Sequence, residues 1–200
     1  MMTWLLVFLG AAMLIALTPG ANNLLGLHHG IQHGLPRALA GLLGRLAAFT
    51  LMIGAVAAGL GQLLAASGPA LTAIKWAGVA YLVWLGVKLL RSKPQPPAEQ
   101  APGPVLRKEF LVAITNPKAV LIFTAFVPQF VDPAHGSPTA QIAILGAVYL
   151  LAEFLAGTAY AAAGAALKSV RLSVRARRNV DRGTGVVLIG MAGTLAAAGS

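Results

Sequence analysis

Polar side chains stand beside two proline breaks in otherwise apolar stretches, and such residues can bind a charged solute. The first break reads Leu17-Thr18-Pro19-Gly20-Ala21-Asn22-Asn23. The second reads Thr115-Asn116-Pro117-Lys118, followed by apolar residues up to Phe126-Val127-Pro128-Gln129-Phe130. In lipid, a proline frees the carbonyl one turn earlier, and such breaks persist where they face protein or a water-filled cavity. Paired breaks in two halves of a membrane protein therefore predict the place where a substrate crosses.

The side chains next to the breaks suit a zwitterionic solute. Asn22, Asn23 and Asn116 offer both hydrogen-bond donors and acceptors, and a freed carbonyl nearby can receive an ammonium group. The alternative is that the asparagines cap interrupted helices. Lys118 either holds a substrate carboxylate, pairs with an acid in the bundle, or extends to the lipid headgroups.

Glu153 is predicted to be the one acidic residue deep inside an apolar segment. Acids within membrane segments are functional candidates by default, so Glu153 is expected to carry a coupled proton or to bind a substrate ammonium. The alternative is a buried ion pair with Arg45 or Lys118. Tyr160 follows two turns later on the same helical face and is expected to line the same cavity.

The predicted substrate-binding residues combine the breaks with these polar groups. They are Pro19, Gly20, Asn22, Asn23, Asn116, Pro117, Lys118, Pro128, Gln129, Glu153 and Tyr160. No catalytic triad, phosphate loop or carboxylate pair is present in the sequence, so an enzyme is not expected, and neither is a cofactor.

Two further groups of ionisable residues are harder to assign from sequence. Arg45 either binds a carboxylate or extends to the cytoplasmic interface, and long basic side chains near helix ends favour the interface. His28, His29 and His33 resemble a metal cluster only in part, because no cysteine or carboxylate accompanies them. A role at the cytoplasmic interface is expected instead, and no metal site is predicted.

The elements that must position these residues are membrane helices. Hydrophobic residues make up 58% of the chain and charged residues 10%, against roughly 25% charged in soluble domains. A spanning helix needs about 20 predominantly apolar residues. The predicted class is therefore an all-α integral membrane protein, and its six predicted spans are 3–25, 38–65, 69–90, 109–131, 139–167 and 183–199.

The positive charges indicate how the chain sits in the bilayer. The net charge is +10, but the basic residues fall in connections between apolar spans, which argues against nucleic-acid binding. They follow the first, third and fifth spans, so these connections are predicted to be cytoplasmic. Both termini are then predicted to be periplasmic in a bacterial inner membrane.

A proline-rich stretch divides the chain into two halves. Residues 1–90 form one predicted three-helix repeat, residues 91–108 a cytoplasmic linker, and residues 109–200 a second three-helix repeat. With three spans in each half, the second repeat inserts upside down relative to the first. The expected fold is thus a pair of inverted repeats whose helices 1 and 4 are broken by proline.

Several strings resemble the lysine exporter family, which includes bacterial homoserine, threonine and leucine exporters. The strings are Thr18-Pro19-Gly20-Ala21-Asn22-Asn23, residues 30–44, Lys75-Trp76-Ala77-Gly78-Val79-Ala80-Tyr81-Leu82-Val83-Trp84-Leu85-Gly86, and the segment from Thr115 to Phe130. The resemblance covers almost the whole chain. This sequence differs from the family at Ala21, where the family has a second proline, and at Arg45, where a neutral residue is expected.

The resemblance implies secondary active export of amino acids or their derivatives, driven by the proton gradient. Its expected partners are an amino-acid-like solute, protons and the lipid bilayer, and the sequence leaves open whether the chain forms a homo-oligomer. Thiol electron carriers of related architecture are excluded because the chain has no cysteine. Alternatives from other classes are an exporter of another small solute or metal cation, and a membrane scaffold that transports nothing.

Overall fold

A computed structural model describes residues 2–59, 68–91, 102–132, 134, 136–169 and 174–197. The regular elements in these ranges are all helices, as the sequence predicts, and no strand occurs among them. Residues 92–101 of the predicted linker, 60–65 of the second predicted span and 198–199 of the sixth lie outside the described residues.

The first half of the chain contains one broken and two continuous helices. Helix α1 (Met2–Leu17) and helix α2 (Ala21–His33) meet at Pro19 and Gly20 with a bend of 62°. Helix α3 (Leu35–Ala57) follows after Gly34, whose φ of 85° favours glycine at this turn. Helix α5 (Gly68–Leu90) coincides closely with the third predicted span.

The second half repeats this order. Helix α6 (Pro102–Ile114) and helix α7 (Pro117–Leu121) meet at Asn116, and α7 continues through a π-helical turn, η1 (Ile122–Phe126), and a 3-10 turn, η2 (Val127–Phe130). The bend between the two parts is 54°. Helix α8 (Pro138–Ser169) and helix α9 (Val174–Ala197) complete the chain. Helices α6 and α9 begin earlier than predicted, so residues 102–108 are helical rather than extended linker.

Several of these helices can cross a membrane. By length and apolar composition, α3 and α8 each qualify, and each bent pair adds one more span if it is counted as a unit. Two to four of the six predicted spans are therefore recognised among the described residues. The proline breaks predicted for helices 1 and 4 are both present.

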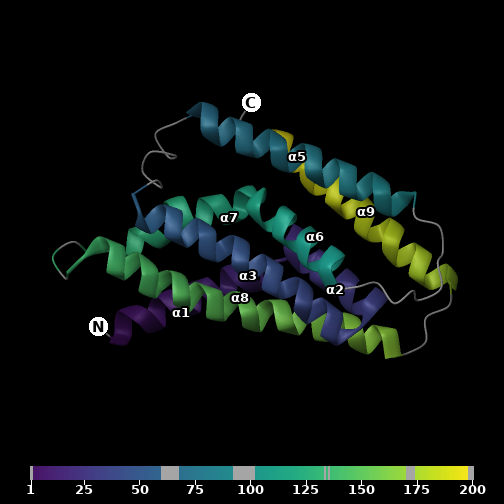
Figure 1. The fold of residues 1–200 in the computed structure, drawn as a ribbon, viewed down its shortest axis with the longest axis horizontal. Helices are drawn as coiled ribbons and strands as arrows, with labels where there is room; N and C mark the ends of the chain where they lie inside the picture. Colours follow the sequence, from purple (N-terminus) through teal and green to yellow (C-terminus); the bar gives the residue numbers. More distant parts are fainter. Residues whose placement is uncertain are drawn as a thin grey trace.

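The two halves of the chain interleave rather than form separate lobes. Helix α2 packs mainly against α8, α6 packs mainly against α3, and α3 also contacts α8. Helices α5 and α9 pair with each other along one side of the bundle (Figure 1). An aromatic core of Phe8, Phe49, Phe123 and Tyr149 lies between the first and second halves. The breaks of both halves consequently come close to the centre of the molecule.

The distribution of polarity is the reverse of that in a soluble protein. Leu14, Leu43 and Leu51 are 72%, 59% and 60% exposed, whereas Arg45 is only 1% exposed and Glu109 is fully buried. Apolar side chains facing outward are stable in lipid, where ionised groups are costly unless they face the interior and pair with one another. The bundle therefore suits a bilayer, with its charges gathered inside.

Glycines allow the closest helix contacts. A Cβ atom added at Gly164 of α8 would overlap the Leu27 carbonyl of α2, and one at Gly44 of α3 would overlap the Leu106 carbonyl of α6. Gly78 of α5 likewise lies against the Thr115 carbonyl at the second break. Small residues at such crossings let helix backbones pack by van der Waals contact, which drives association in membranes.

Candidate functional site

The first break is stabilised by side chains that satisfy the carbonyls at the end of α1. A helix leaves its last four carbonyls without partners, and lipid offers none. Here Lys118 of α7 donates from Nζ to the carbonyls of Ile15 and Thr18, at 2.8 and 3.1 Å. Asn23 donates from Nδ2 to the Ala16 and Thr18 carbonyls, at 2.7 and 3.2 Å. A lysine and an asparagine thus replace the missing turn.

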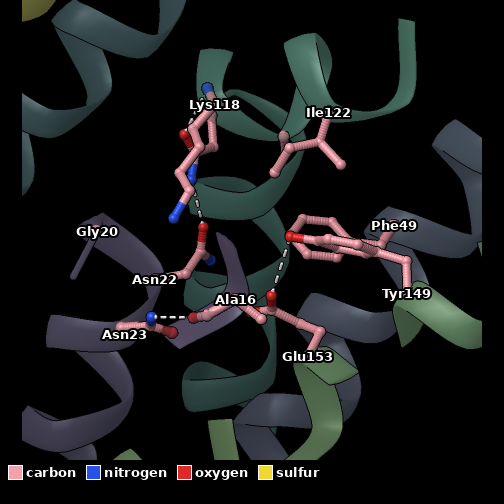
Figure 2. Close-up of a pocket in the computed structure, with 11 residues that line it drawn as sticks. Ala16, Gly20, Asn22, Asn23, Phe49, Lys118, Ile122, Tyr149 and Glu153 are labelled. Carbon is pink, nitrogen blue, oxygen red and sulfur yellow. Dashed lines mark hydrogen bonds between the residues drawn. The ribbon is translucent and has the colours of Figure 1, made fainter. Parts of the chain in front are cut away.

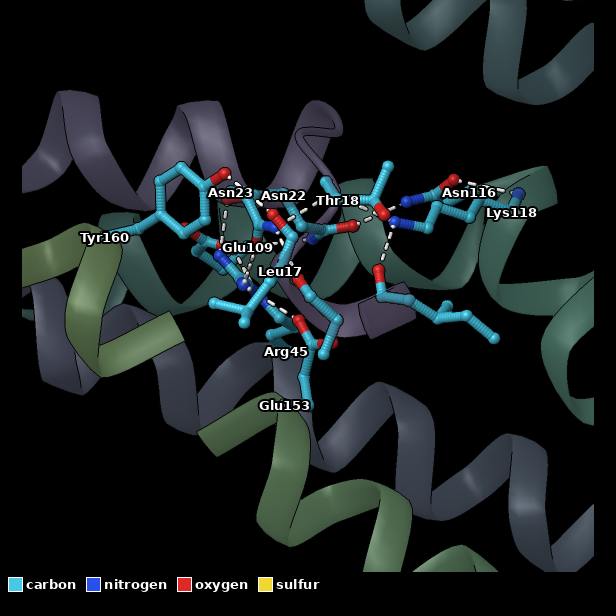
Figure 3. Close-up of polar contacts among 12 residues, drawn as sticks. Leu17, Thr18, Asn22, Asn23, Arg45, Glu109, Asn116, Lys118, Glu153 and Tyr160 are labelled. Carbon is cyan, nitrogen blue, oxygen red and sulfur yellow. Dashed lines mark hydrogen bonds and ion pairs between the residues drawn. The ribbon is translucent and has the colours of Figure 1, made fainter. Parts of the chain in front are cut away.

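The remaining carbonyls of this turn also have partners. The Tyr160 hydroxyl of α8 donates to the Leu17 carbonyl at 3.0 Å. The Leu14 carbonyl accepts from the Thr18 backbone N–H and from the Thr18 hydroxyl. The break is therefore supported by α2, α7 and α8 together, and Figure 3 shows these donors converging on it.

The second break is capped by Asn116. Its Oδ1 accepts from the Lys118 backbone N–H at 3.0 Å, and Pro117 follows at the first helical position, where its missing N–H costs nothing. The Nδ2 of Asn116 donates to Oδ1 of Asn22 at 2.7 Å. One hydrogen bond between asparagines thus joins the two breaks.

Arg45 lies at the centre of the bundle, which corrects the expectation that it extends to the cytoplasmic interface. Its guanidinium is fully surrounded, with Nη1 2.9 Å from Oε1 of Glu153 and Nη2 3.0 Å from Oε2 of Glu109. Nη1 also donates to Oδ1 of Asn23 at 3.1 Å, and Nη2 donates to the Asn22 carbonyl. Five donors in a planar fork suit arginine to bridge groups from several helices.

Glu109 is a central residue that the sequence interpretation missed. In the sequence it stands at the predicted boundary between linker and span, beside Arg107 and Lys108. The structure buries its carboxylate completely on α6. One signal for this was available: Val105 and Val112 lie four residues before and three after it, on the same helical face, and both are buried. Glu153 is therefore not the only acid deep inside the bundle.

Glu153 is 4% exposed and forms an ion pair with Arg45, which is the alternative role that the sequence allows for it. Its other carboxylate oxygen, Oε2, lies 3.4 Å from the Tyr149 hydroxyl, which is placed to donate to it. Glu153 differs from Glu109 in one important respect, since Glu153 also borders a cavity. It is thus the buried acid that a solute in the cavity can reach.

The cavity lies where the two breaks meet and is narrow: its volume is about 20 Å³, room for about one water molecule. Figure 2 shows Lys118 on one side of it and Tyr149 with Glu153 on another. Six of the predicted residues line the cavity, namely Gly20, Asn22, Asn23, Asn116, Lys118 and Glu153. The other lining residues are Ala16, Phe49, Ala119, Ile122 and Tyr149.

Five predicted residues do not line this cavity. Pro19 is exposed at the break, and Pro117 lies near Gly78 of α5. Pro128 and Gln129 belong to η2, where Gln129 is exposed. Tyr160 reaches the break only through the Leu17 carbonyl. Pro19, Pro117 and Tyr160 thus shape or support the breaks instead of facing the cavity.

Two of the three histidines are buried among the helices. His29 is 1% exposed and His28 7% exposed, whereas His33 is partly exposed. The Nδ1 atom of His28 lies 3.5 Å from Asp181 of α9, and the Nδ1 atom of His29 lies 3.4 Å from Oε1 of Glu109. His28 and His29 therefore each face one carboxylate.

Three glycines make room for the charged groups. A Cβ added at Gly26 of α2 would lie 3.0 Å from Nη2 of Arg45, and one at Gly157 of α8 would lie 3.3 Å from Nη1. A Cβ at Gly41 of α3 would lie 3.1 Å from Cγ of Glu109. The guanidinium and the Glu109 carboxylate are thus held in a space that larger residues would fill.

Comparison with known proteins places this arrangement in a family. The sequence profile of the LysE type translocators matches residues 5–199, nearly the whole chain. The chain belongs to the LysE type translocator family. The resemblance noted from the sequence is thereby confirmed, and this family consists of membrane translocators rather than enzymes.

Individual relatives include named efflux proteins. The chain is 31% identical to a homoserine/homoserine lactone efflux protein of Salmonella typhimurium over 163 residues, 79% of each chain. It is 27% identical to a leucine efflux protein of Klebsiella pneumoniae, over 70% of this chain and 69% of the relative. An uncharacterized membrane protein of Vibrio cholerae is 32% identical over 81% of both chains. No solved structure matches this LysE family member.

Proposed function

We propose that this LysE family protein is a secondary active exporter of amino acids or amino-acid derivatives, working by proton antiport in the bacterial inner membrane. The observation that carries the proposal is the polar cavity at the meeting point of two broken helices, bordered by a buried glutamate in an ion pair. Discontinuous helices with this placement are typical of substrate sites in secondary transporters. The efflux proteins among its relatives support the same class of solute.

The polar groups around the cavity are arranged to bind both charges of an amino acid. The N-terminus of α2 begins at the buried Gly20–Asn22 segment, and a helix N-terminus favours a carboxylate. Lys118 stands opposite Gly20, with its Nζ 3.8 Å from the position of a Gly20 Cβ, and adds a positive charge. Glu153 offers a negative charge to the substrate ammonium. Asn22, Asn23 and Asn116 would exchange their present hydrogen bonds for bonds to the solute.

Coupling follows from competition for the same buried negative charge. Arg45 faces two buried carboxylates, Glu109 and Glu153. Either the substrate ammonium, bound at Glu153, or the coupled proton neutralises the excess negative charge of this cluster, because an unneutralised carboxylate in the bundle is costly. Binding the solute therefore favours proton release, and binding a proton favours solute release. This reciprocal exclusion is the requirement for antiport.

Alternating access would use the two breaks as hinges. Pro19, Pro117 and Pro128 prevent continuous helices in corresponding parts of the two halves, and α3 with α8 and α5 with α9 form matching pairs. We assign the chain six membrane helices in two inverted repeats, residues 1–90 and 109–200. Rocking of one set of helices against the other would then open the cavity to either side in turn.

The arrangement of basic residues supports a cytoplasmic position for the odd-numbered connections. Arg37, Lys108 and Lys168, from the first, third and fifth connections, all lie close enough to His33 to act on it electrostatically. Basic residues from separate connections thus gather at one end of the bundle, as the positive-inside rule requires of a cytoplasmic face. Both termini are then periplasmic.

The alternatives gain no specific support. The described residues hold no group of three or more histidine, cysteine or acidic side chains suited to a metal ion. A scaffold without transport has no need of a polar cavity between broken helices. The amino-acid exporter therefore accounts for more of the geometry.

The proposal is tested by profiling what the protein exports. A bacterium lacking its own exporters is loaded with a mixture of dipeptides that together supply the twenty amino acids, and every amino acid outside the cells is measured. We expect a selective rise that collapses when a protonophore is added. No rise for any amino acid, with the protein present in the membrane, would contradict the proposal.

Glu153→Gln provides the matching residue-level test in these cells. The variant keeps the size of the side chain but removes the charge for which proton and ammonium compete, so gradient-driven efflux should fall by about 10²-fold or more. Asp132→Asn is the control, because Asp132 is an exposed acid outside the cavity. Full efflux by Glu153→Gln would exclude Glu153 from coupling.

A further inference from the structure

Two buried polar atoms face each other without a hydrogen bond. Nδ1 of His29 and Oε1 of Glu109 lie 3.4 Å apart, each is inaccessible to solvent, and neither has a hydrogen-bond partner. Buried polar atoms almost always have a partner, so an unpaired donor and acceptor in contact call for an explanation. A proton held between an imidazole and a carboxylate would satisfy both atoms.

The charges around this pair favour binding of one extra cation. Arg45 is the single guanidinium bound to two carboxylates, Glu109 and Glu153. With His29 neutral, the ion-paired cluster of Arg45, Glu109 and Glu153 carries one net negative charge, and a net charge on a buried cluster is expensive. Lys118 does not pair with either acid, since its ammonium donates to the carbonyls of Ile15 and Thr18. A proton on His29, or an ammonium at Glu153, restores neutrality.

The contacts form a continuous line from the basic end of the bundle to the cavity. His33, which is partly exposed, has its ring 6.0 Å from the ring of His29. His29 contacts Glu109, Glu109 contacts Arg45, and Arg45 contacts Glu153 at the cavity. The substrate would reach one end of this line, and the proton would leave from the other end toward the cytoplasm.

Charged and titratable groups from several helices surround His29 and the two histidines beside it. The His29 ring itself lies near the rings of His28 and His33 on α2 and against Glu109 of α6, whose carboxylate also pairs with Arg45 of α3. Arg37, Lys108 and Lys168 lie near His33, and Asp181 of α9 lies near His28. Among the described residues, Glu109 is the acid placed against the His29 ring, which makes its carboxylate the group that can retain an imidazolium proton.

We propose that His29 and Glu109 together hold the exchanged proton of this transporter. The proton enters from the periplasm when the cavity opens to that side, reaches the pair by way of Glu153, and is released by His29 at the cytoplasmic end. Without substrate, His29 carries the proton and donates it to Oε1 of Glu109, and the buried cluster is neutral. When an ammonium binds at Glu153, the cluster is neutral without that proton, so the proton leaves His29 on the side of His33. This inference rests on the proposed antiport and assigns its proton to a pair outside the cavity.

The test separates movement of substrate from movement of protons. Dipeptide-loaded cells measure net efflux, which requires the proton to return through the protein. A second assay uses an amino acid that wild-type cells export and measures its exchange for a ¹³C-labelled external copy. This exchange requires only the substrate-bound states of the protein. His29→Gln and Glu109→Gln are compared with His28→Gln, which alters the adjacent histidine facing Asp181.

We expect His29→Gln and Glu109→Gln to keep exchange and to lose net efflux by about tenfold or more, the effect of removing a proton-transfer group. His28→Gln should retain both. Net efflux at the wild-type rate in His29→Gln would overturn the inference, and so would loss of exchange in both variants, because a proton carrier is not needed for exchange. Wild-type cells without protonophore-sensitive efflux would instead overturn the proposed function itself.

Discussion

At the scale of single residues, the centre of this protein is organised by one arginine. Arg45 contacts two carboxylates and the first break at once, through Glu109, Glu153, Asn22 and Asn23. Arg45 neutralises the two buried acids. It is not expected to add net stability, since a buried ion pair rarely stabilises a protein more than apolar residues of the same volume. The protein is consequently expected to lose more stability when one of Arg45, Glu109 and Glu153 is replaced than when all three are replaced together.

Replacing Arg45 alone should therefore destabilise the protein strongly. In Arg45→Met, two carboxylates remain buried without a cation, and the free energy of unfolding should fall by about 3–5 kcal/mol. The triple variant Arg45→Met, Glu109→Gln, Glu153→Gln removes the charges together and should recover most of that loss. Both are measured by unfolding of the purified protein in mixed detergent micelles. A triple variant no more stable than Arg45→Met would contradict this account.

At the scale of helices, the breaks depend on partners that are distant in sequence. The carbonyls at the end of α1 are satisfied by Lys118 and Tyr160, which belong to the other half of the chain, as well as by Asn23. Proline starts the break, but these side chains keep it stable in an apolar surrounding. The geometry of each break is thus a property of the packed bundle.

Lys118→Met should weaken the first break. The partly buried Ile15 carbonyl would lose the Lys118 ammonium that donates to it, which costs about 1–3 kcal/mol. Efflux should fall as well, because the lysine also faces the cavity. The control is Lys88→Met, which removes a lysine that lies over the Trp84 ring on α5. Thermal stability in detergent and amino-acid efflux are measured for both. Equal effects of the two substitutions would argue against a specific role for Lys118.

The crossing of α2 and α8 should tolerate no added methyl group. In Gly164→Ala the new Cβ meets the Leu27 backbone, which cannot move aside cheaply, so we expect a loss of about 1–3 kcal/mol. Gly190→Ala on α9 is the matched control, because a Cβ there finds no atom within 4 Å. Unfolding in detergent compares the two. Similar stabilities would mean that the helices separate without cost.

At the scale of the whole molecule, the proposed topology puts the two ends of α3 on opposite sides of the bilayer. The Gly34 end is close to Lys168, and the other end carries Ala58 at the C-terminus of the helix. The chain lacks cysteine, so single cysteines report orientation without any background. Such a measurement tests the arrangement of the complete bundle.

Pro36→Cys and Ala58→Cys, both at exposed positions, should differ in their labelling. A membrane-impermeant maleimide added to intact cells should label Ala58→Cys and not Pro36→Cys, since the positive-inside rule places Pro36 next to the cytoplasm. Ser137→Cys, ahead of α8, should be labelled as well. Permeabilised cells, where all three should react, provide the control. The reverse pattern would invert the proposed topology.

Much of this architecture was predictable because it depends on local composition. Long apolar segments must form helices in lipid, where the backbone can satisfy its hydrogen bonds only internally. The helical class and both breaks therefore agree with the prediction. Six of the residues predicted to bind substrate line the cavity. Starts of helices were less predictable, since α6 begins within a proline-rich segment at Pro102.

The charged cluster is what only the tertiary structure decided. The sequence by itself determined that apolar helices carry a few ionisable residues, and it marked Glu153 as significant. It did not determine that Arg45 turns inward or that Glu109 and His29 join it, because depth in a bundle depends on which helices pack against each face. Those contacts link α2, α3, α6 and α8 across long stretches of sequence. In an apolar interior, each charge is stable only beside its partners, so their positions are settled together when the helices assemble.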